Sequence, residues 1–244
     1  MGLGYIGLPT AALFSNEGLR VLGVDTNALV LKKVSQGNSH IIEPDLAERV
    51  KRAINKGLLN VASKPQASDF FIIAVPTPIR EDKSPDDTYV MSAIRSIAPV
   101  LRKGNLIVIE STSPVGTTEK AVDLLKNLRP DLSFPMKGRS DEDIHVVYCP
   151  ERVIPGKALK EMRENDRTIG CHSEKAYEKA CSLYKIIVEG ECVKAPIRAA
   201  EMAKLTENAF RDVNIAFANE LQKICENEGI NCFELIRLAN RHPR

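Results

Sequence analysis

The stretch that decides the fold is MGLGYIGLP, residues 1–9. Its three glycines, Gly2, Gly4 and Gly7, have the spacing GxGxxG. In a dinucleotide-binding fold, the first glycine permits a tight turn out of a strand. The second lets the backbone approach a pyrophosphate, and the third lets the following helix pack closely. The amides at the start of that helix then face the phosphates, so the stretch predicts a Rossmann-type dinucleotide site.

An acidic residue strengthens this prediction and selects the cofactor. Asp25 follows the apolar run VLGV at residues 21–24, where the second strand of such a fold ends. A carboxylate there accepts hydrogen bonds from the adenosine ribose hydroxyls and repels the additional phosphate of NADP. Glycine spacing alone also occurs in ordinary turns, but together with Asp25 it predicts NAD binding.

One part of the predicted fold has little sequence to form it. A dinucleotide-binding domain needs an apolar strand before the first glycine, usually the central strand of the sheet, and only Met1 precedes Gly2. We therefore expect the chain to lack most of that strand, either because the reading frame starts late or because the chain is a piece of a longer protein. A central strand buries both faces, so we expect its loss to destabilise the sheet.

The composition is that of an ordinary globular protein. Lysine and arginine number 34 against 32 acidic residues, which gives a net charge of +2, and 43% of the residues are hydrophobic. This balance argues against nucleic acid and anionic membranes as partners. We find no apolar run near the roughly 20 residues of a membrane span, and no secretory signal. The six cysteines lack CxxC or zinc-ligand spacing, so we expect no metal, reduced thiols and a cytoplasmic location.

Apolar runs alternate with amphipathic segments over the first 150 residues. The pattern predicts strands at residues 19–24, 69–75, 106–111 and 145–148, and helices at 5–17, 27–36, 44–56, 87–101 and 116–128. Further along, it predicts strands at 168–170 and 186–188 on either side of a helix at 174–184. This alternation predicts an α/β fold with a doubly wound parallel sheet.

A long helical pattern follows the predicted sheet. It runs from about Pro196 to Glu228, is closed by Gly229, and precedes a shorter helix at 232–240. About 33 residues at 1.5 Å each make a helix of roughly 50 Å, more than one small domain covers. We therefore expect an NAD-binding domain at 1–190, a long-helix region at 191–244, and a homodimer that packs two copies of the helix together.

Polar residues follow three predicted strands, at the sheet edge where ligands of open α/β folds bind. They form the segments VPTP at 75–78, ESTSPVGTT at 110–118 and PERVIPG at 150–156. Hydroxyls of the second segment either cap the following helix or hold a water or the nicotinamide. In the third segment, an acid and a base between two prolines, Glu151 and Arg152, favour a functional role over a solvated pair.

The long helix carries a polar face. Glu201, Lys204, Asn208 and Arg211 recur at steps of three and four residues. Such a face is either solvated and held by ordinary ion pairs or part of a site. Asparagine is a poor helix former, which favours a functional reason for Asn208. A lysine and an amide one turn apart are suited to polarising an alcohol or stabilising an oxyanion.

These motifs resemble those of the nucleotide-sugar 6-dehydrogenases, the UDP-glucose and UDP-N-acetylmannosamine dehydrogenase family. The resemblance extends over the whole chain and rests on GLGYIGLP, VPTP, ESTSPVGTTE, PERVIPG and AEMAKLTENAFRDVNIAFANEL. The SPVGTTE, PERVIPG and final HPR segments are closer to the N-acetylmannosamine branch. The resemblance implies that a UDP-sugar is oxidised at its C6 alcohol to a carboxylate, in two steps that use two NAD.

The resemblance also implies roles for individual residues. Lys204 and Asn208 would stabilise the oxyanion of a covalent intermediate, while Glu151 and Thr112 would position the hydrolytic water. Contacts to NAD would come from Tyr5, Ile6, Asp25, Thr77 and Thr112, beside the glycines of the first motif. Contacts to the nucleotide sugar would come from Arg152, Val153, Lys204, Asn208, Arg211, His242 and Arg244.

One departure from the family pattern matters for the chemistry. The family's nucleophile is a cysteine in a glycine-rich segment of the GGHC type, and none of the six cysteines here, Cys149 included, has such a context. We therefore expect the chain to correspond to the NAD-binding domain and central helix, without the nucleotide-binding domain, and not to oxidise a nucleotide sugar to the acid alone. Two alternatives stay open: an inactive NAD-binding or dimerisation module, and a UDP-glucose 6-dehydrogenase. A third, a β-hydroxyacid-type dehydrogenase, should need no PERVIPG loop.

Overall fold

The computed structural model describes residues 1–136 and 141–242. The chain divides into two compact units, Met1–Lys204 and Leu205–Arg244. The predicted division into 1–190 and 191–244 stays a prediction.

The first unit alternates strands and helices. In its described residues the strands are β1 (Val21–Val24), β2 (Leu59–Ala62), β3 (Phe70–Ile73), β4 (Leu106–Ile109), β5 (His145–Tyr148), β6 (Arg167–Gly170) and β7 (Cys192–Ala195). The helices are α1 (Gly7–Asn16), α2 (Ala28–Ser35), α3 (Leu46–Asn55), α4 (Thr88–Ile97), α5 (Thr117–Leu128), α6 (Ala158–Glu164) and α7 (Glu174–Tyr184), with a short 3-10 helix, η1, at Ala98–Val100.

The strands form two groups that the first residues of the chain connect. β1 pairs with β2, and the other five strands follow the order β3-β4-β5-β6-β7. The Gly2 amide donates to the Val24 carbonyl, and the Ala74 amide donates to the Met1 carbonyl, both at 2.8 Å. Every strand pair is parallel except β5 and β6, where Tyr148 lies opposite Gly170 in an antiparallel pair. The predicted α/β fold is confirmed, with this one antiparallel pair as a difference.

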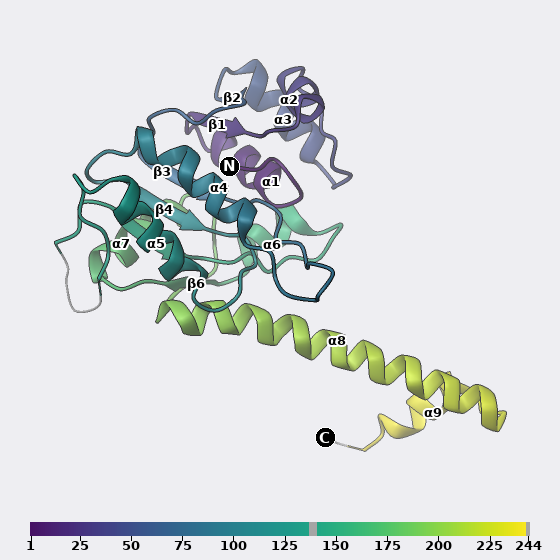
Figure 1. Cartoon of the computed structure of the whole chain (residues 1–244). Coiled ribbons are helices and arrows are strands. Elements are labelled where there is room, and N and C mark those ends of the chain that lie inside the picture. The colour runs from purple at the N-terminus through teal and green to yellow at the C-terminus, as the bar shows by residue number, and fades with distance from the viewer. Residues whose placement is uncertain (137–140, 243–244) are drawn as a thin grey trace. The chain divides into compact units, whose positions relative to one another are not determined.

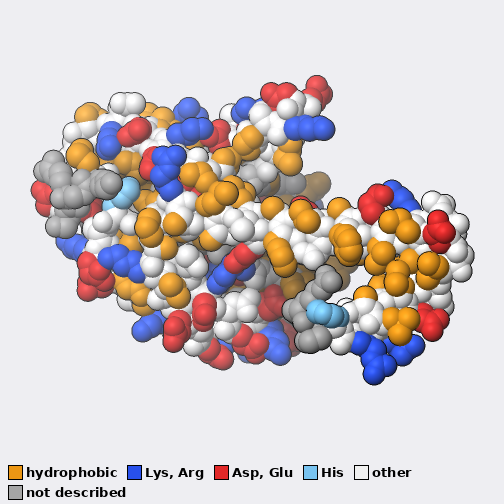
Figure 2. Space-filling model, turned by 90° about the horizontal axis from the view of Figure 1, so that it is seen from below, with side chains coloured by type: hydrophobic (Ala, Val, Ile, Leu, Met, Phe, Trp, Pro, Cys, Tyr) orange, Lys and Arg blue, Asp and Glu red, His pale blue; other side chains and the backbone are white. Residues whose placement is uncertain are grey.

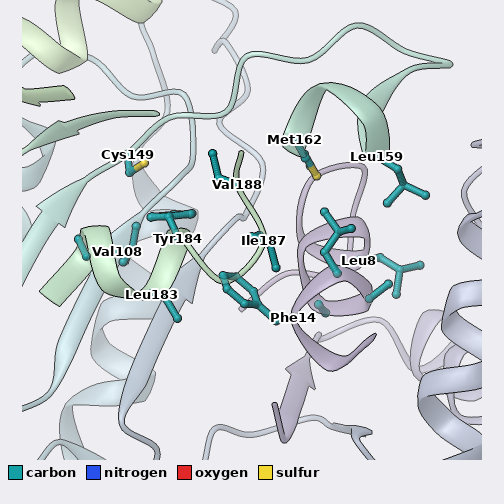
Figure 3. Close-up of a cluster of buried hydrophobic side chains, with 14 of the residues drawn as sticks. Leu8, Phe14, Val108, Cys149, Leu159, Met162, Leu183, Tyr184, Ile187 and Val188 are labelled. Atoms are coloured by element: carbon teal, nitrogen blue, oxygen red, sulfur yellow. The ribbon is translucent and has the colours of Figure 1, made fainter. Parts of the chain in front are cut away.

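Helices cover both faces of the larger sheet (Figure 1), and each face has its own apolar core. In β4, Leu106 and Val108 belong to the core that includes residues of α1 and α7, whereas Ile107 and Ile109 belong to the core that includes α4 and α5. Figure 3 shows the first core, where the rings of Phe14 and Tyr184 from α1 and α7 approach with centroids 6.3 Å apart. A strand buried on both faces needs apolar side chains at every position, which explains its unbroken apolar run.

One predicted strand is wrong. Residues 186–188 do not pair; instead the amides of Ile187 and Val188 donate to the Tyr184 carbonyl, at 2.9 and 2.8 Å, and continue the last turn of α7. Both side chains are buried in the first core, so their apolar character reflects packing and not a strand. The last strand is β7, which carries exposed Lys194 at the sheet edge and so has no continuous apolar run.

Two further elements have no counterpart in the predictions, namely β2 and α6. β2 is only half-buried, and α6 is 7 residues long, too short for a clear helical period. The other predicted strands and helices are present with ends that differ by a few residues.

The predicted long helix is confirmed. α8 spans Ile197–Glu228 and begins in the first unit, and the second unit contains the rest of α8 together with α9 (Cys232–Ala239). In the second unit large apolar side chains are exposed, among them Phe210 (72%), Phe217 (68%) and Phe233 (87%). Figure 2 shows hydrophobic atoms over much of the surface of α8 and α9. No helix in the described ranges is long and apolar enough to cross a membrane.

Candidate active site

The turn at residues 2–7 leaves space for a ligand at one glycine and none at the other two. Gly2 has φ +84°, and a Cβ there would lie 2.4 Å from the Ala74 carbonyl oxygen; a Cβ on Gly7 would lie 1.9 Å from the Gly2 oxygen. A Cβ on Gly4 would have no protein atom within 4 Å. Gly2 and Gly7 are therefore required by the fold itself, whereas Gly4 keeps its backbone open to a bound group. These residues fit the pyrophosphate of a dinucleotide.

The start of α1 completes this turn. Tyr5 precedes Ile6, the N-cap of α1, which offers no side-chain hydrogen bond to the helix. Backbone amides at such a helix start are suited to binding an anion, because their N–H groups point out of the helix at the positive end of its dipole.

Asp25 is held at the carboxyl end of β1 by two backbone amides. Its Oδ2 accepts from Leu3 and its Oδ1 accepts from Asn27, each at 2.8 Å. A carboxylate oxygen has a further lone pair, so these contacts fix the orientation of Asp25 without exhausting its capacity to accept ribose hydroxyls.

Thr77 and Thr112 follow neighbouring strands. They lie half-buried beyond the carboxyl ends of β3 and β4, which pair in parallel. The Ser111 hydroxyl donates to the Val75 carbonyl at 2.8 Å and so ties the two strand ends together. This contact places the predicted nicotinamide contacts on one edge of the sheet.

The start of α5 is capped by a residue of α8. The buried Glu201 carboxylate accepts from the Gly116 amide at 2.6 Å, the Thr118 amide at 2.9 Å and the Thr118 hydroxyl at 2.7 Å. The hydroxyls of the ESTSPVGTT segment are therefore not the main cap of α5. Glu201 was predicted to belong to a polar face of α8. Its side chain is instead buried against the start of α5 and fixes the first turn of α8 there.

Glu151 has a buried cationic partner that the sequence does not reveal. Its carboxylate pairs with the guanidinium of Arg167 at the start of β6, and both side chains are 3% exposed. The Arg152 amide donates to Glu151 Oε1 at 2.8 Å, but the Arg152 guanidinium donates to the Asp166 carbonyl at 2.8 Å. Glu151 is thus oriented by the guanidinium of Arg167 and by the backbone amide of Arg152.

The guanidinium of Arg167 stacks over the ring of Tyr184, which in turn contacts a second acid, Glu110. The guanidinium carbon lies 5.0 Å from the centre of the Tyr184 ring. The Tyr184 hydroxyl donates to Glu110 Oε1 at 2.6 Å. Burial lowers the pKa of Arg167, but Glu151 and other anionic groups raise it by more, so the guanidinium stays charged.

Burial raises the pKa of Glu110 to about 7, and the neighbouring charges change it less. The folded-state pKa is therefore above the unfolded value of 4.5. Between these values the folded state holds a proton that the unfolded state releases, so stability falls as the pH rises through this window.

Glu110→Gln is expected to abolish this loss. The free energy of unfolding of the variant minus that of the wild type should increase by about 2–3 kcal/mol from pH 5 to pH 8.5, because the amide has no proton to release. Urea unfolding of both chains at the two pH values measures the difference. Glu164→Gln, an exposed charge on α6, controls for the loss of one carboxylate. A difference between wild type and Glu110→Gln that stays constant with pH would contradict a protonated Glu110.

Residues predicted on α8 and beyond fall into different parts of the structure. Lys204 is half-buried at the end of the first unit. Asn208 and Arg211 belong to the second unit, where the Arg211 guanidinium donates to Asn208 Oδ1 at 2.9 Å. His242 is exposed in the second unit, and Arg244 lies outside the described residues. The first unit thus gathers the residues predicted for NAD, together with Glu151, Arg152 and Val153 after β5; Asn208, Arg211 and His242 are not among them.

Comparison with known proteins gives the family. Residues 1–188 match the NAD binding domain of the UDP-glucose/GDP-mannose dehydrogenase family, and residues 198–244 match its central domain. The chain belongs to this family. Family membership confirms the predicted cofactor class, NAD, and the Rossmann-type domain that the glycine turn and Asp25 indicate.

Members of this family resemble the chain along its whole length. A UDP-N-acetyl-D-mannosamine dehydrogenase from Yersinia pestis is 57% identical over 244 residues, and an NDP-N-acetyl-D-galactosaminuronic acid dehydrogenase from Ralstonia nicotianae is 53% identical. The solved structure of a UDP-D-ManNAc dehydrogenase from Pyrococcus horikoshii superposes with a TM-score of 0.91 at 46% identity. All of this chain is covered in each case, but it spans only 58% of both curated relatives and 57% of the solved chain.

Proposed function

We propose that the chain provides the NAD-binding and central parts of an NAD-dependent dehydrogenase that oxidises the C6 alcohol of UDP-N-acetyl-D-mannosamine to a carboxylate. The supporting observation is the arrangement of the carboxyl ends of β3, β4 and β5. These parallel strands carry Thr77, Thr112 and Glu151 to one edge, and the backbone pairing of residues 1–2 joins the glycine turn and Asp25 to the same sheet. The choice of sugar rests on the relatives named above.

NAD, when bound, would supply the hydride acceptor. Asp25 would hold the adenosine ribose, the amides around Gly4 and the start of α1 would hold the pyrophosphate, and Thr77 and Thr112 would contact the nicotinamide. The loop that begins with Glu151 follows the neighbouring parallel strand β5, and its Arg152 and Val153 would contact the nucleotide sugar.

Lys204 would stabilise oxyanions during the two oxidations, and Glu151 would act in the final hydrolysis. In the first oxidation C6 would lose a hydride to NAD and its hydroxyl would lose a proton to solvent, which gives an aldehyde. A cysteine thiol from the part of the full-length protein outside this chain would add to the aldehyde, and loss of a second hydride to a second NAD would leave a thioester. Water would then attack the thioester, release the acid and restore the thiol. Lys204 and Asn208 stabilise the oxyanions that form at the carbonyl oxygen. Glu151, whose carboxylate is held by Arg167, would orient the water together with Thr112.

Cys149 is not the thiol in this proposal. It is fully buried, and burial raises its pKa to about 12, so the thiolate that attacks a carbonyl is strongly disfavoured.

Substrate selection is tested with the product of the full reading frame that encodes this chain. Purified protein is assayed with UDP-N-acetylmannosamine, UDP-N-acetylglucosamine and UDP-glucose, each with NAD and with NADP, and kcat/KM is compared. We expect the highest kcat/KM with UDP-N-acetylmannosamine and NAD. Preference for UDP-glucose would refute the proposed sugar, and preference for NADP would refute the role of Asp25.

We also propose that the protein forms a homodimer through α8. Phe210, Val213, Phe217 and Ile224 are exposed and recur at heptad-like spacing, the pattern with which two helices pack. Light scattering at micromolar concentration should give a dimer. Phe217→Glu should shift it to monomer, because a charge in the centre of an apolar interface is not compensated, while Asn219→Glu, on the opposite side of the helix, should leave the dimer intact. A monomeric wild type would refute this part of the proposal.

A further inference from the structure

A buried carboxylate outside the predicted site joins two of its loops. Glu43 lies between α2 and α3 and is 8% exposed, although it follows the fully exposed Ile42. Acidic residues are almost never this buried unless they are paired or hydrogen-bonded. Glu43 has no cationic partner among the ion pairs found in the described residues, and its contacts are hydrogen bonds.

Three donors from two distant parts of the sequence converge on Glu43. Its Oε2 accepts from the Tyr5 hydroxyl at 2.7 Å and from the Gly156 amide at 2.9 Å. Its Oε1 accepts from the Ala158 amide at 2.6 Å. The Gly156 amide also lies within hydrogen-bond distance of the Tyr5 hydroxyl, at 3.1 Å. Tyr5, Gly156 and Glu43 thus form a closed triangle.

This triangle connects two segments with different ligands. Tyr5 belongs to the glycine turn, directly before α1, and Gly156 ends the PERVIPG loop that contains Glu151 and Arg152. Burial and the hydrogen bond to Glu43 raise the pKa of the Tyr5 phenol, so it stays a neutral donor. A cap for α6 requires only the contact to Ala158; the contact between Glu43 and the turn is additional.

On the basis of the proposed function, we propose that Glu43 is a positioning residue that couples the NAD turn to the nucleotide-sugar loop. When NAD contacts the turn and fixes Tyr5, the shared oxygen of Glu43 holds Gly156 more firmly and orders the loop that receives the sugar. Because such coupling is reciprocal, an ordered loop also strengthens NAD binding.

Hydrogen exchange on this chain tests the coupling, with NADH as the probe. In the wild type, we expect NADH to slow exchange of the Gly156 and Ala158 amides about fivefold, the effect of strengthening one hydrogen bond of ordinary net energy. In Tyr5→Phe, which removes only the hydroxyl, the two amides should exchange at nearly the wild-type rate without NADH, but NADH should slow them less than about twofold. In Glu43→Gln the amides should exchange faster and also lose the response.

Glu161→Gln is the matched control. Glu161 Oε2 accepts from the Ile154 amide at 2.7 Å in the same loop and has no contact with Tyr5 among the hydrogen bonds found. This variant should weaken the hydrogen bond from the Ile154 amide, because a neutral amide oxygen is a poorer acceptor than a carboxylate, yet keep the NADH response at Gly156. Tyr5→Phe, the smaller change, decides the matter if Glu43→Gln does not fold.

The outcomes separate this inference from the proposed function. A wild-type chain that binds no NADH overturns both. A wild-type chain that binds NADH without slowing Gly156, a Tyr5→Phe chain that keeps the full response, or a Glu161→Gln chain that loses it, overturns the coupling role of Glu43 and leaves NAD binding intact.

Discussion

Arg167→Met is expected to lower the free energy of unfolding by about 3–5 kcal/mol, because it leaves the Glu151 carboxylate buried without a compensating charge. Glu151 and Arg167 are both 3% exposed, so bulk water does not solvate the carboxylate in place of the lost guanidinium. The same substitution removes the guanidinium from the face of Tyr184. Urea unfolding of the wild type and the variant measures the loss.

Two variants establish that the cause is the uncompensated charge. Arg163→Met removes an arginine whose pairs with Glu17 and Glu189 are partly exposed, at 3.2 Å each, and should cost less than about 1 kcal/mol. Arg167→Met combined with Glu151→Leu should recover most of the stability, since no buried charge is left unpaired. A double variant as unstable as Arg167→Met alone would show that Arg167 acts through packing and not through Glu151.

Lys204→Met in the full-length product is expected to lower kcat about 10²–10³-fold, the usual effect of removing one group that stabilises a developing oxyanion. The KM for NAD should change little because the glycine turn and Asp25, not Lys204, are proposed to hold the cofactor. Steady-state kinetics with both substrates varied gives the two parameters separately. Lys223→Met, an exposed lysine of the same helix that pairs with Glu220, should retain wild-type kcat. A rise in KM alone would instead make Lys204 a residue that binds the sugar in its ground state.

Local sequence motifs were sufficient for the fold class and for the cofactor class, NAD. The turn and the cofactor class could be predicted because the requirements are local. They depend on the backbone conformation at each glycine and on one acid at a strand end, namely Gly2, Gly4, Gly7 and Asp25. The apolar runs of β3, β4 and β5 predict buried strands for the same reason: burial on both faces affects each residue of the strand directly.

The partners of Glu43 and Arg167 could not be predicted because they are distant from these residues in the sequence. Glu43 precedes the proline that begins a helical pattern, and nothing near it indicates Tyr5 or Gly156. Arg167 begins a short strand and pairs with Glu151, an acid 16 residues earlier, and no local pattern links the two. The same limit explains the error at residues 186–188, where apolar side chains pack into a core without joining a strand.

The most direct test of the account is the stoichiometry of the reaction. The full-length product is incubated with a limiting amount of UDP-N-acetylmannosamine and excess NAD, NADH is measured by absorbance, and the sugar product is identified by mass spectrometry. The account predicts two NADH per sugar and a uronic acid product. One NADH per sugar with an aldehyde as product, or no NADH at all while UDP-glucose is oxidised, would contradict it.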